Sequence, residues 1–247
     1  MTFARRAAVV LGVPALVVGV LGVEVLIARN GPEPEEPPGG VGVTFEAAPG
    51  PVTLWLGDST AAGVGVSSTA DALPLQVAAL ESEEGSLVVL AVSGDTIEDA
   101  VRDQLSQLQG IAVGRVARVF ISIGANDVTH LTSVGSFRST YRDLIGGLRS
   151  RLGHEVPIVM LGVPDMGAPP RLAQPLRAVA GWRGRRLDRE VRAIASEASN
   201  ATYVPIAATT GPAFRDDTDR YFAADDYHPS AEGYGLWARA VVDTLGR

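Results

Sequence analysis

The stretch VTLWLGDST, residues 52–60, joins a short apolar run to a turn of Gly, Asp, Ser and Thr. Four further apolar runs of similar length follow it along the chain. Short runs rich in β-branched residues indicate strands of a sheet that is covered on both faces. The five expected strands are VTLWL (52–56), LVVLAV (87–92), VARVFISI (116–123), VPIVMLGV (156–163) and ATYVPI (201–206).

Each apolar run is followed by a longer stretch with helical character. An alternation of strand and helix predicts a parallel, doubly wound sheet with helices on both faces. The carboxyl ends of the strands then share one rim, where such sheets bind their ligands. The expected helices lie at 70–82, 96–109, 136–152, 171–199 and 230–245, and the expected rim loops at 57–69, 93–95, 124–135, 163–170 and 207–229.

The N-terminus has the pattern of a membrane-spanning helix. From Ala7 to Val23 no side chain is polar, and after Glu24 the apolar run resumes to residue 28. These 22 residues would extend about 33 Å as a helix, enough to cross a bilayer core of about 30 Å. Arg5 and Arg6 precede the run, which favours a cytoplasmic N-terminus and an extracytoplasmic remainder.

A retained anchor is favoured over a cleaved signal peptide, because the run is long and lacks an A-x-A cleavage pattern at its end. Secretion after cleavage is the alternative. Residues 29–50 are rich in Pro, Gly and Glu, which is typical of a linker. The chain therefore divides into an anchor or signal segment (1–28), a linker (29–50) and one globular domain (51–247).

The composition excludes several kinds of chemistry. The chain of 247 residues contains no Cys, and all 21 of its Lys and Arg residues are Arg. Thiol nucleophiles and Schiff-base lysines are therefore excluded. The three His residues, His130, His154 and His228, have no metal-binding spacing, so neither a metal nor another cofactor is expected. The net charge of −7 disfavours a nucleic-acid partner.

Polar residues with hydroxyl, imidazole, carboxylate and amide groups are concentrated in the rim loops. Together they supply the groups that acyl transfer from an ester requires: a nucleophile, a base, a carboxylate that orients the base, and donors for an oxyanion. The four blocks are Gly57-Asp58-Ser59-Thr60, Ser93-Gly94-Asp95, Gly124-Ala125-Asn126-Asp127 and Asp225-Asp226-Tyr227-His228-Pro229-Ser230.

In their order and their placement on the expected elements, these blocks resemble those of the SGNH hydrolases, also called the GDSL esterase/lipase family. The resemblance covers about residues 51–247 and implies a flavodoxin-like, three-layer α/β/α fold with a five-stranded parallel sheet. It also implies that Ser59 is the nucleophile, that Asp225 and His228 complete a catalytic triad, and that Ser59, Gly94 and Asn126 form the oxyanion hole. Thr60 stands where the family name has Leu, a position outside the reacting set.

The same roles follow from the chemistry of the residues. The imidazole of His228 is suited to take the proton of Ser59 and return it to a leaving alcohol. Asp225, three residues earlier, is the preferred orienting carboxylate, with Asp226 as its rival. Ser230 is expected to cap the last helix. Asp58 and Asp127 are expected to bind neighbouring loop amides rather than substrate.

Three residues are weaker candidates for substrate binding. His130 lies on the loop that carries Asn126, and Met166 and Trp182 follow the fourth strand. Each also has an ordinary structural interpretation, as an exposed loop or core side chain. The Arg-rich stretch 171–192 is interpreted as a charged outer helix face, or as a surface that faces anionic lipid headgroups.

The sequence thus predicts a serine esterase of the SGNH type, anchored in a membrane with its catalytic domain outside. Its expected substrates are carboxylic esters, either lipid esters or O-acetylated envelope sugars. The alternative is an extracytoplasmic binding domain that has the hydrolase fold without catalysis.

Overall fold

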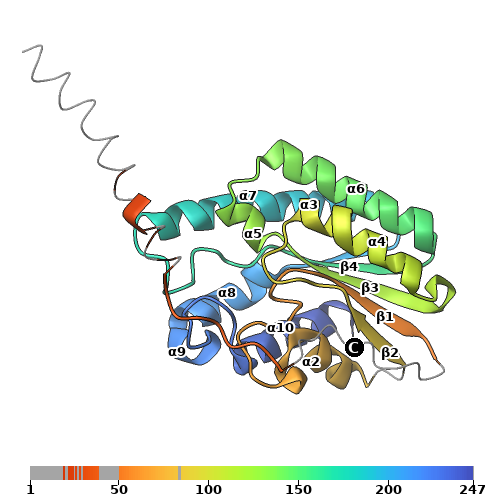
Figure 1. Cartoon of the computed structure of the whole chain (residues 1–247), viewed down its shortest axis with the longest axis horizontal. Coiled ribbons are helices and arrows are strands. Elements are labelled where there is room, and N and C mark those ends of the chain that lie inside the picture. The colour runs from red at the N-terminus through yellow and green to blue at the C-terminus, as the bar shows by residue number, and fades with distance from the viewer. Residues whose placement is uncertain are drawn as a thin grey trace, which may run out of the picture.

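The computed structural model describes residues 19, 22–24, 26, 28, 30–38, 50–82 and 85–246. A parallel sheet of five strands forms its centre, in the order β2-β1-β3-β4-β5 (Figure 1). This is the strand order of flavodoxin-like sheets, so the predicted fold class is confirmed for the domain. The strands are β1 (Val52–Gly57), β2 (Ser86–Val89), β3 (Val116–Ser122), β4 (Ile158–Leu161) and β5 (Ala201–Val204).

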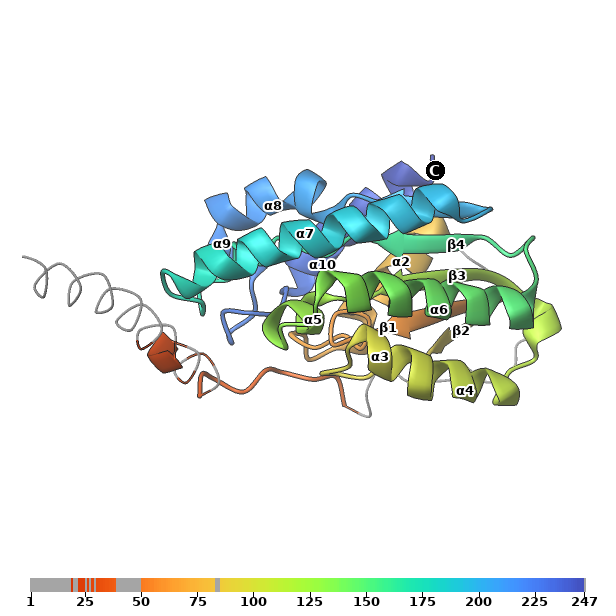
Figure 2. The same cartoon turned by 90° about the horizontal axis from the view of Figure 1, so that it is seen from above.

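Helices cover both faces of the sheet and produce three layers (Figure 2). One face is covered by α3 (Ile97–Asp99), a π-helical turn (Ala100–Gln104), α4 (Leu105–Gln107), α6 (Val134–Leu152) and α7 (Leu176–Glu197). The opposite face is covered by α2 (Leu73–Glu81), α8 (Ile206–Asp216) and α10 (Ala231–Thr244). Two short helices, α5 (Ala125–Thr129) and α9 (Thr218–Tyr221), lie in the loops that follow β3 and α8.

The alternation of side chains along the strands builds two separate cores. Leu54 of β1 packs beneath α6 and α7, whereas its neighbour Trp55 points to the opposite face. There Trp55 stacks on Phe120 of β3 with 4.4 Å between the ring centroids. Both faces of the sheet are therefore dry, which explains why the strands appear as continuous apolar runs.

The observed elements are shorter than predicted at several ends. β2 ends at Val89, although Leu90 still donates to the carbonyl of Trp55. β5 ends at Val204, because Pro205 has no N–H for the ladder. Three short 3₁₀ turns complete the connections, at Thr69–Asp71, Leu108–Gly110 and Val113–Arg115.

The expectation of an irregular loop at 207–229 is wrong. This segment holds α8, which begins at Ile206, and α9. Gly211 and Pro212 lie inside α8 and make its sequence look like a turn. The error matters for the site, because α8 forms one wall of the pocket described below.

The predicted membrane anchor, residues 1–28, and the central part of the linker lie largely outside the described residues. None of the helices formed by the described residues has the length and apolar character needed to cross a membrane. The last residue of the predicted anchor and the described linker residues contact the domain: the carbonyls of Ala28 and Pro32 accept hydrogen bonds from Arg171, at 2.6 and 3.0 Å. Glu35 likewise accepts one from the N–H of Gly65, at 2.8 Å.

Candidate active site

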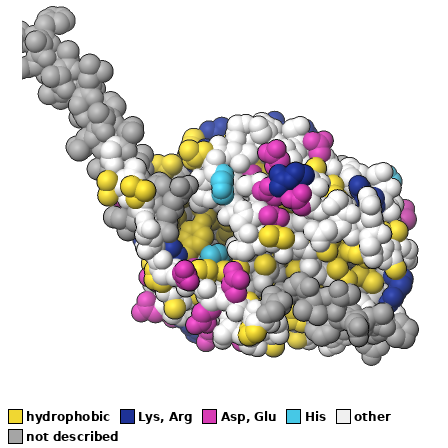
Figure 3. All heavy atoms as spheres, viewed as in Figure 1, with side chains coloured by type: hydrophobic (Ala, Val, Ile, Leu, Met, Phe, Trp, Pro, Cys, Tyr) yellow, Lys and Arg dark blue, Asp and Glu magenta, His cyan; other side chains and the backbone are white. Residues whose placement is uncertain are grey.

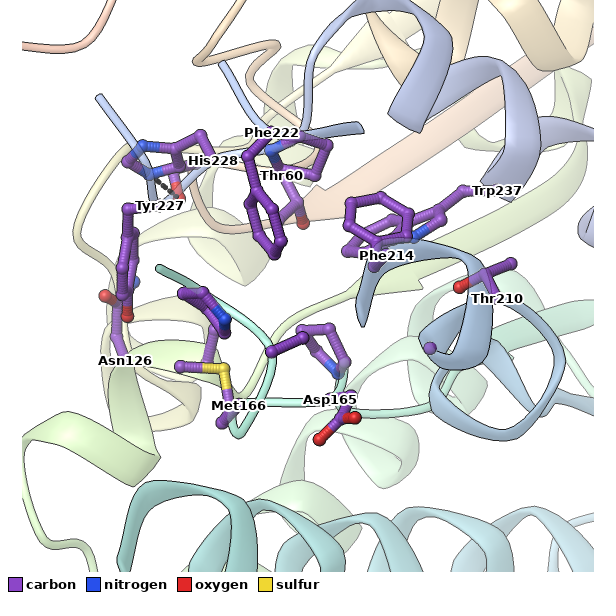
Figure 4. Close-up of a pocket in the computed structure, with 17 residues that line it drawn as sticks. Thr60, Asn126, Asp165, Met166, Thr210, Phe214, Phe222, Tyr227, His228 and Trp237 are labelled. Carbon is purple, nitrogen blue, oxygen red and sulfur yellow. Dashed lines mark hydrogen bonds between the residues drawn. The ribbon is translucent and has the colours of Figure 1, made fainter. Parts of the chain in front are cut away.

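A small pocket of about 40 Å³ lies at the carboxyl ends of the strands, where the sequence predicts the rim. Its lining comes from the segments after β1, β3 and β4, from α8, from the segment before α10 and from Trp237 of α10 (Figure 4). Ser59, Asn126 and His228, which are far apart in the sequence, all line it. The prediction that these loops meet at one rim is therefore confirmed.

Ser59 lies on a tight turn that begins at the end of β1. Gly57 is required there, because a Cβ at this position would lie 2.1 Å from the carbonyl oxygen of Ser122. The carboxylate of Asp58 accepts hydrogen bonds from the N–H of Thr60 at 3.0 Å and from its hydroxyl at 2.8 Å. Burial raises the pKa of Asp58, and the bonds from Thr60 partly offset that effect. As predicted, Asp58 serves the turn.

The side chains of Ser59, His228 and Asp225 form a continuous hydrogen-bonded row. Nε2 of His228 lies 3.1 Å from Oγ of Ser59, and Nδ1 of the same ring lies 2.6 Å from Oδ2 of Asp225. The second oxygen of Asp225 accepts from the N–H groups of Tyr227 and His228, both at 3.0 Å. Asp226 is exposed and has φ +58°, so it is not the residue that orients the ring.

The environment of Asp225 favours its ionised form. The residue is only 1% exposed, and burial by itself raises the pKa of the carboxyl. The hydrogen bonds from the ring and backbone of His228 and from the backbone of Tyr227 outweigh burial, so the pKa is lowered below its ordinary value. A buried carboxylate that stays ionised can hold the ring in one orientation and stabilise its positive charge.

The segment that carries Asp225 and His228 is fixed at both ends. Phe222 and Pro229 form an antiparallel bridge, and the N–H of Ala223 donates to the carbonyl of His228 at 2.8 Å. Ser230 caps α10 by accepting from the N–H of Gly233 at 3.1 Å, as predicted. The start of α10 therefore follows directly after the histidine.

Gly94 and Asn126 lie on the two loops next to Ser59. Gly94 has φ +90° in the loop after β2, and a Cβ there would meet no atom within 4 Å. The side-chain amide of Asn126 donates to the carbonyl of Asp95 at 3.0 Å, which leaves its second N–H for another acceptor. The amide of Asn126, which lines the pocket, can supply a hydrogen bond to a negatively charged oxygen there, whereas Gly94 is exposed and is not among the residues that line the pocket.

Comparison with known proteins identifies the family. The family model described as "GDSL-like Lipase/Acylhydrolase family" matches residues 55–236. The chain belongs to this family. It is 34% identical over 221 residues to the GDSL-like esterase Rv1075c of Mycobacterium tuberculosis, a match that covers 83% of this chain and 68% of that protein.

Solved structures share the fold of the present chain at lower sequence identity. A lipase/acylhydrolase from Enterococcus faecalis superposes with a TM-score of 0.59 at 22% identity, covering 80% of this chain and 96% of that one. The psychrotrophic esterase EstA from Pseudoalteromonas sp., solved with monoethylphosphonate as inhibitor, gives a TM-score of 0.58 at 16% identity. That alignment covers 79% of this chain and 96% of the other.

The three weaker substrate-binding candidates have different positions in this family member. Met166 is buried and lines the small pocket. His130 lies outside the small pocket, in a neighbouring groove, where its Nδ1 is 2.8 Å from the carbonyl oxygen of Asn126. Trp182 is 50% exposed on α7, lines neither cavity and lies beneath the guanidinium of Arg186. Its position does not support the prediction that it borders an acyl pocket.

Several arginines of the 171–192 stretch hold the GDSL-like domain together. Arg177 donates to the carbonyls of Leu172 and Pro170, at 2.6 and 2.8 Å. Arg171 approaches Oδ2 of Asp225 to 3.8 Å. These contacts give part of the stretch a structural role, and an interaction with anionic lipid stays a prediction.

Sequence reasoning missed Gln104, which connects two of the family blocks. Its side chain accepts from the N–H of Gly57 at 2.9 Å and donates to the carbonyl of Gly57 at 2.7 Å. It also donates to Oδ2 of Asp95 at 2.8 Å. Gln104 is fully buried at the end of the π-helical turn, a type of distortion that is frequent at functional sites.

A buried carboxyl lies on the helix that carries Asn126. Oδ2 of Asp127 accepts from the N–H of Ile97 at 3.0 Å, as expected for a residue that binds a loop amide, whereas Oδ1 is buried without a partner among the described residues. Burial raises the pKa of Asp127 to about 6. Within the part of the chain that the structure describes, no group of His, Asp and Glu side chains is arranged to hold a metal ion.

Proposed function

We propose that this member of the GDSL-like family is a serine esterase that cleaves carboxylic esters through an acyl-enzyme on Ser59. The observation that carries the proposal is the hydrogen-bonded row in which Ser59 Oγ lies 3.1 Å from His228 Nε2 and His228 Nδ1 lies 2.6 Å from Asp225. Distances of this size allow direct proton transfer between the hydroxyl and the ring.

In the first half of the reaction, His228 removes the proton of Ser59 as Oγ attacks the ester carbonyl. The negative charge that develops on the carbonyl oxygen is met by the N–H groups of Ser59 and Gly94 and by the amide of Asn126. The loss of one such donor typically costs about 3–4 kcal/mol of transition-state stabilisation. His228 then transfers its proton to the leaving alcohol, while Asp225 stabilises the charged ring.

In the second half, a water molecule takes the place of the alcohol. His228 accepts a proton from this water as it attacks the acyl-enzyme, and returns the proton to Ser59 as the acid leaves. All proton transfers use one ring nitrogen, so the mechanism needs no group beyond the residues named above.

We also propose that the enzyme works at the outer face of a membrane, held by residues 1–28. The apolar run from Ala7 to Val23 supports this location. Lipid esters and O-acetylated envelope sugars would both be within reach of such an enzyme. The location is tested by fractionation of cells that express the full chain. We expect the protein in the membrane fraction and its domain accessible to protease added from outside.

The catalytic proposal is tested with p-nitrophenyl esters from acetyl to palmitoyl and the full-length chain. We expect hydrolysis by the wild type, and a loss in kcat of at least about a thousandfold in Ser59→Ala, because members of a triad act as a unit. The unfolding temperature should change little. If the wild type and Ser59→Ala are equally inactive on every ester, the non-catalytic binding domain becomes the better interpretation.

A further inference from the structure

The segment that precedes the domain is attached to it at three places, the first of which is Glu24. This residue interrupts the apolar run, is 8% exposed, and accepts a hydrogen bond from the N–H of Leu176 at 2.9 Å, where α7 begins. The N-terminus of a helix has free N–H groups and favours a negative charge. Figure 1 shows the segment, in red and orange, running along the domain, and Figure 3 shows a hollow with hydrophobic side chains beside it.

The second attachment is the side chain of Arg171. Its Nε donates to the carbonyl of Ala28 at 2.6 Å, and its Nη1 donates to the carbonyl of Pro32 at 3.0 Å. Gly31 passes directly over the guanidinium, because a Cβ at this position would overlap it. The segment therefore fits closely around this one side chain, and the glycine makes the close approach possible.

Arg171 also contacts the loop that carries the catalytic carboxylate. Its Nη1 lies 3.5 Å from the carbonyl oxygen of Asp225 and 3.8 Å from Oδ2 of the same residue. Its backbone N–H donates to the carbonyl of Asp226 at 3.0 Å. The side chain of Arg171 is 16% exposed, so little water is available to replace these partners. The carbonyls of the segment thus help to decide where the positive charge lies relative to Asp225.

The third attachment lies on the other side of the same loop. The carbonyl of Glu35 accepts from the N–H of Gly65 at 2.8 Å. Gly65 has φ +104°, and a Cβ there would lie 3.0 Å from Cβ of His228 and would overlap the carbonyl oxygen of Pro229. The backbone at Gly65 therefore packs directly against the catalytic histidine. Through Arg171 and Gly65, the segment supports the loop at both of its ends.

We propose that Arg171 is a positioning residue of the triad, and that residues 28 and 30–35 act with it as a strap that holds the loop of Asp225 and His228 in its reactive arrangement. The proposal rests on the esterase function proposed above. A segment that served only as a tether would need none of these contacts, since a tether works through its length and stiffness. The strap thus joins the predicted anchor to the catalytic machinery.

Two substitutions in the full-length chain, each with a matched control, test the strap. Arg171→Met removes the guanidinium and keeps a long side chain. Its control is Arg177→Met, because Arg177 also donates to two backbone carbonyls, but to those of the chain just before α7. Gly31→Ala changes no group of the domain and pushes the strap away from Arg171. Its control is Gly22→Ala, where the added Cβ meets no atom within 4 Å.

The first measurement is the hydrolysis of p-nitrophenyl acetate. A displacement of about 1 Å in a catalytic group can cost about a hundredfold in rate, and the strap is expected to move the loop by less than that. We therefore expect kcat to fall by about tenfold in Arg171→Met and by about three- to tenfold in Gly31→Ala. KM should stay within about threefold, because the small acetyl ester is bound by other residues. Both controls should stay within about twofold of the wild type.

The second measurement needs no turnover. The proton between Nδ1 of His228 and Asp225, atoms that lie 2.6 Å apart, is followed in the downfield region of the proton NMR spectrum of the full chain in detergent. We expect its signal in the wild type and in both controls. The signal should be weakened by faster exchange with water in Arg171→Met and Gly31→Ala, because the loop is then held less firmly.

The two measurements separate this proposal from the esterase function. If no variant and no wild-type chain hydrolyses any ester while the NMR signal follows the expected pattern, the esterase proposal fails and the strap still positions the loop. If Arg171→Met and Gly31→Ala match their controls in kcat and in the NMR signal, the strap does not position the triad. A loss of unfolding stability in Arg171→Met, with kcat and the signal unchanged, would also overturn the proposal and leave Arg171 a structural role alone.

Discussion

Gln104 offers a test of how the site is held together. Its side chain makes three hydrogen bonds, two to the backbone of Gly57 and one to the carboxylate of Asp95. Gly57 begins the turn of Ser59, and the carbonyl of Asp95 accepts from the amide of Asn126 at 3.0 Å. Gln104 therefore connects the turn that carries Ser59 with the loop after β2, which in turn holds the side chain of Asn126.

The cost of Gln104→Met can be worked from these bonds. The substitution keeps the volume and removes the polar atoms. The carbonyl of Gly57 keeps a partner in the N–H of Val92, at 3.2 Å, whereas its buried N–H loses its acceptor. A buried group without a partner costs about 1–3 kcal/mol, and the lost bond to the partly exposed Asp95 about 1 kcal/mol more. We expect the free energy of unfolding to fall by about 2–4 kcal/mol.

Catalysis should fall as well, because the loop that holds Asn126, a proposed oxyanion donor, loses one of its supports. The complete loss of one oxyanion donor costs about 10²- to 10³-fold in kcat. Since Gln104→Met displaces the donors without removing them, a decrease in kcat of about tenfold to a hundredfold is expected, with KM within about threefold. Gln104→Glu places a carboxylate against Asp95, so its stability and activity should recover as the pH falls and the introduced group becomes protonated.

The assay is hydrolysis of p-nitrophenyl acetate, with urea unfolding of the same samples. If Gln104→Met is as stable as the wild type, the hydrogen bonds of Gln104 contribute nothing to stability. A second contradicting result is a fall in stability by the expected amount while kcat stays unchanged. In that case Gln104 supports the fold without positioning the site.

Three further predictions concern stability. Asp127, whose pKa burial raises to about 6, holds its proton more tightly in the folded than in the unfolded state, so its ionisation destabilises the fold as the pH rises from about 4 to 7. As the pH rises over that range, the free energy of unfolding of Asp127→Asn should increase relative to that of the wild type, by at most about 3 kcal/mol. Urea unfolding at several pH values measures this difference. Thr60→Leu removes a hydroxyl that lies 2.7 Å from Oγ of Ser122 and should cost about 1–3 kcal/mol, whereas Thr60→Ser should cost less than about 1 kcal/mol; equal losses in both variants would contradict this. Ser230→Ala removes the cap of α10 and should lower stability by about 1 kcal/mol in thermal unfolding, with Ser230→Asn close to the wild type.

The sheet could be predicted from the sequence because its strands are buried on both faces. Such strands are continuous apolar runs, and the parallel arrangement then places every loop that follows a strand at one rim. This reasoning brings Ser59, Asn126 and His228 together without any knowledge of distances. It also explains why Asp225 is favoured, since a residue three positions before His228 can reach its ring within one turn.

Elements that depend on distant contacts could not be predicted in the same way. Gly211 and Pro212 suggest a turn, yet the surrounding residues form α8, because Ile206 and Phe214 are buried against the sheet and α10. Tertiary packing overrides the local preference there. Trp182 is a large aromatic residue of the kind that often lines pockets, but it faces solvent. Its direction depends on how α7 is oriented about its own axis, which the local sequence does not specify.

The contacts of Gln104 and the groove beside the small pocket arise only when the chain folds, and the sequence does not reveal them. The side chain of Gln104 reaches a residue 47 positions earlier in the sequence, and glutamine on a helix has no signature that reveals such a contact. The groove brings residues from 28 to 227 to one surface. Nothing in the sequence around Leu131 indicates that its backbone is left-handed, with φ +59°.

The most direct test of the central claim is covalent labelling of the full-length chain with a fluorophosphonate, followed by mass spectrometry of the intact protein and of its peptides. We expect one adduct per chain, located on Ser59, which is absent in Ser59→Ala and forms far more slowly in His228→Gln. A folded wild-type chain that gains no adduct, or gains one on another residue while Ser59 stays free, would contradict it.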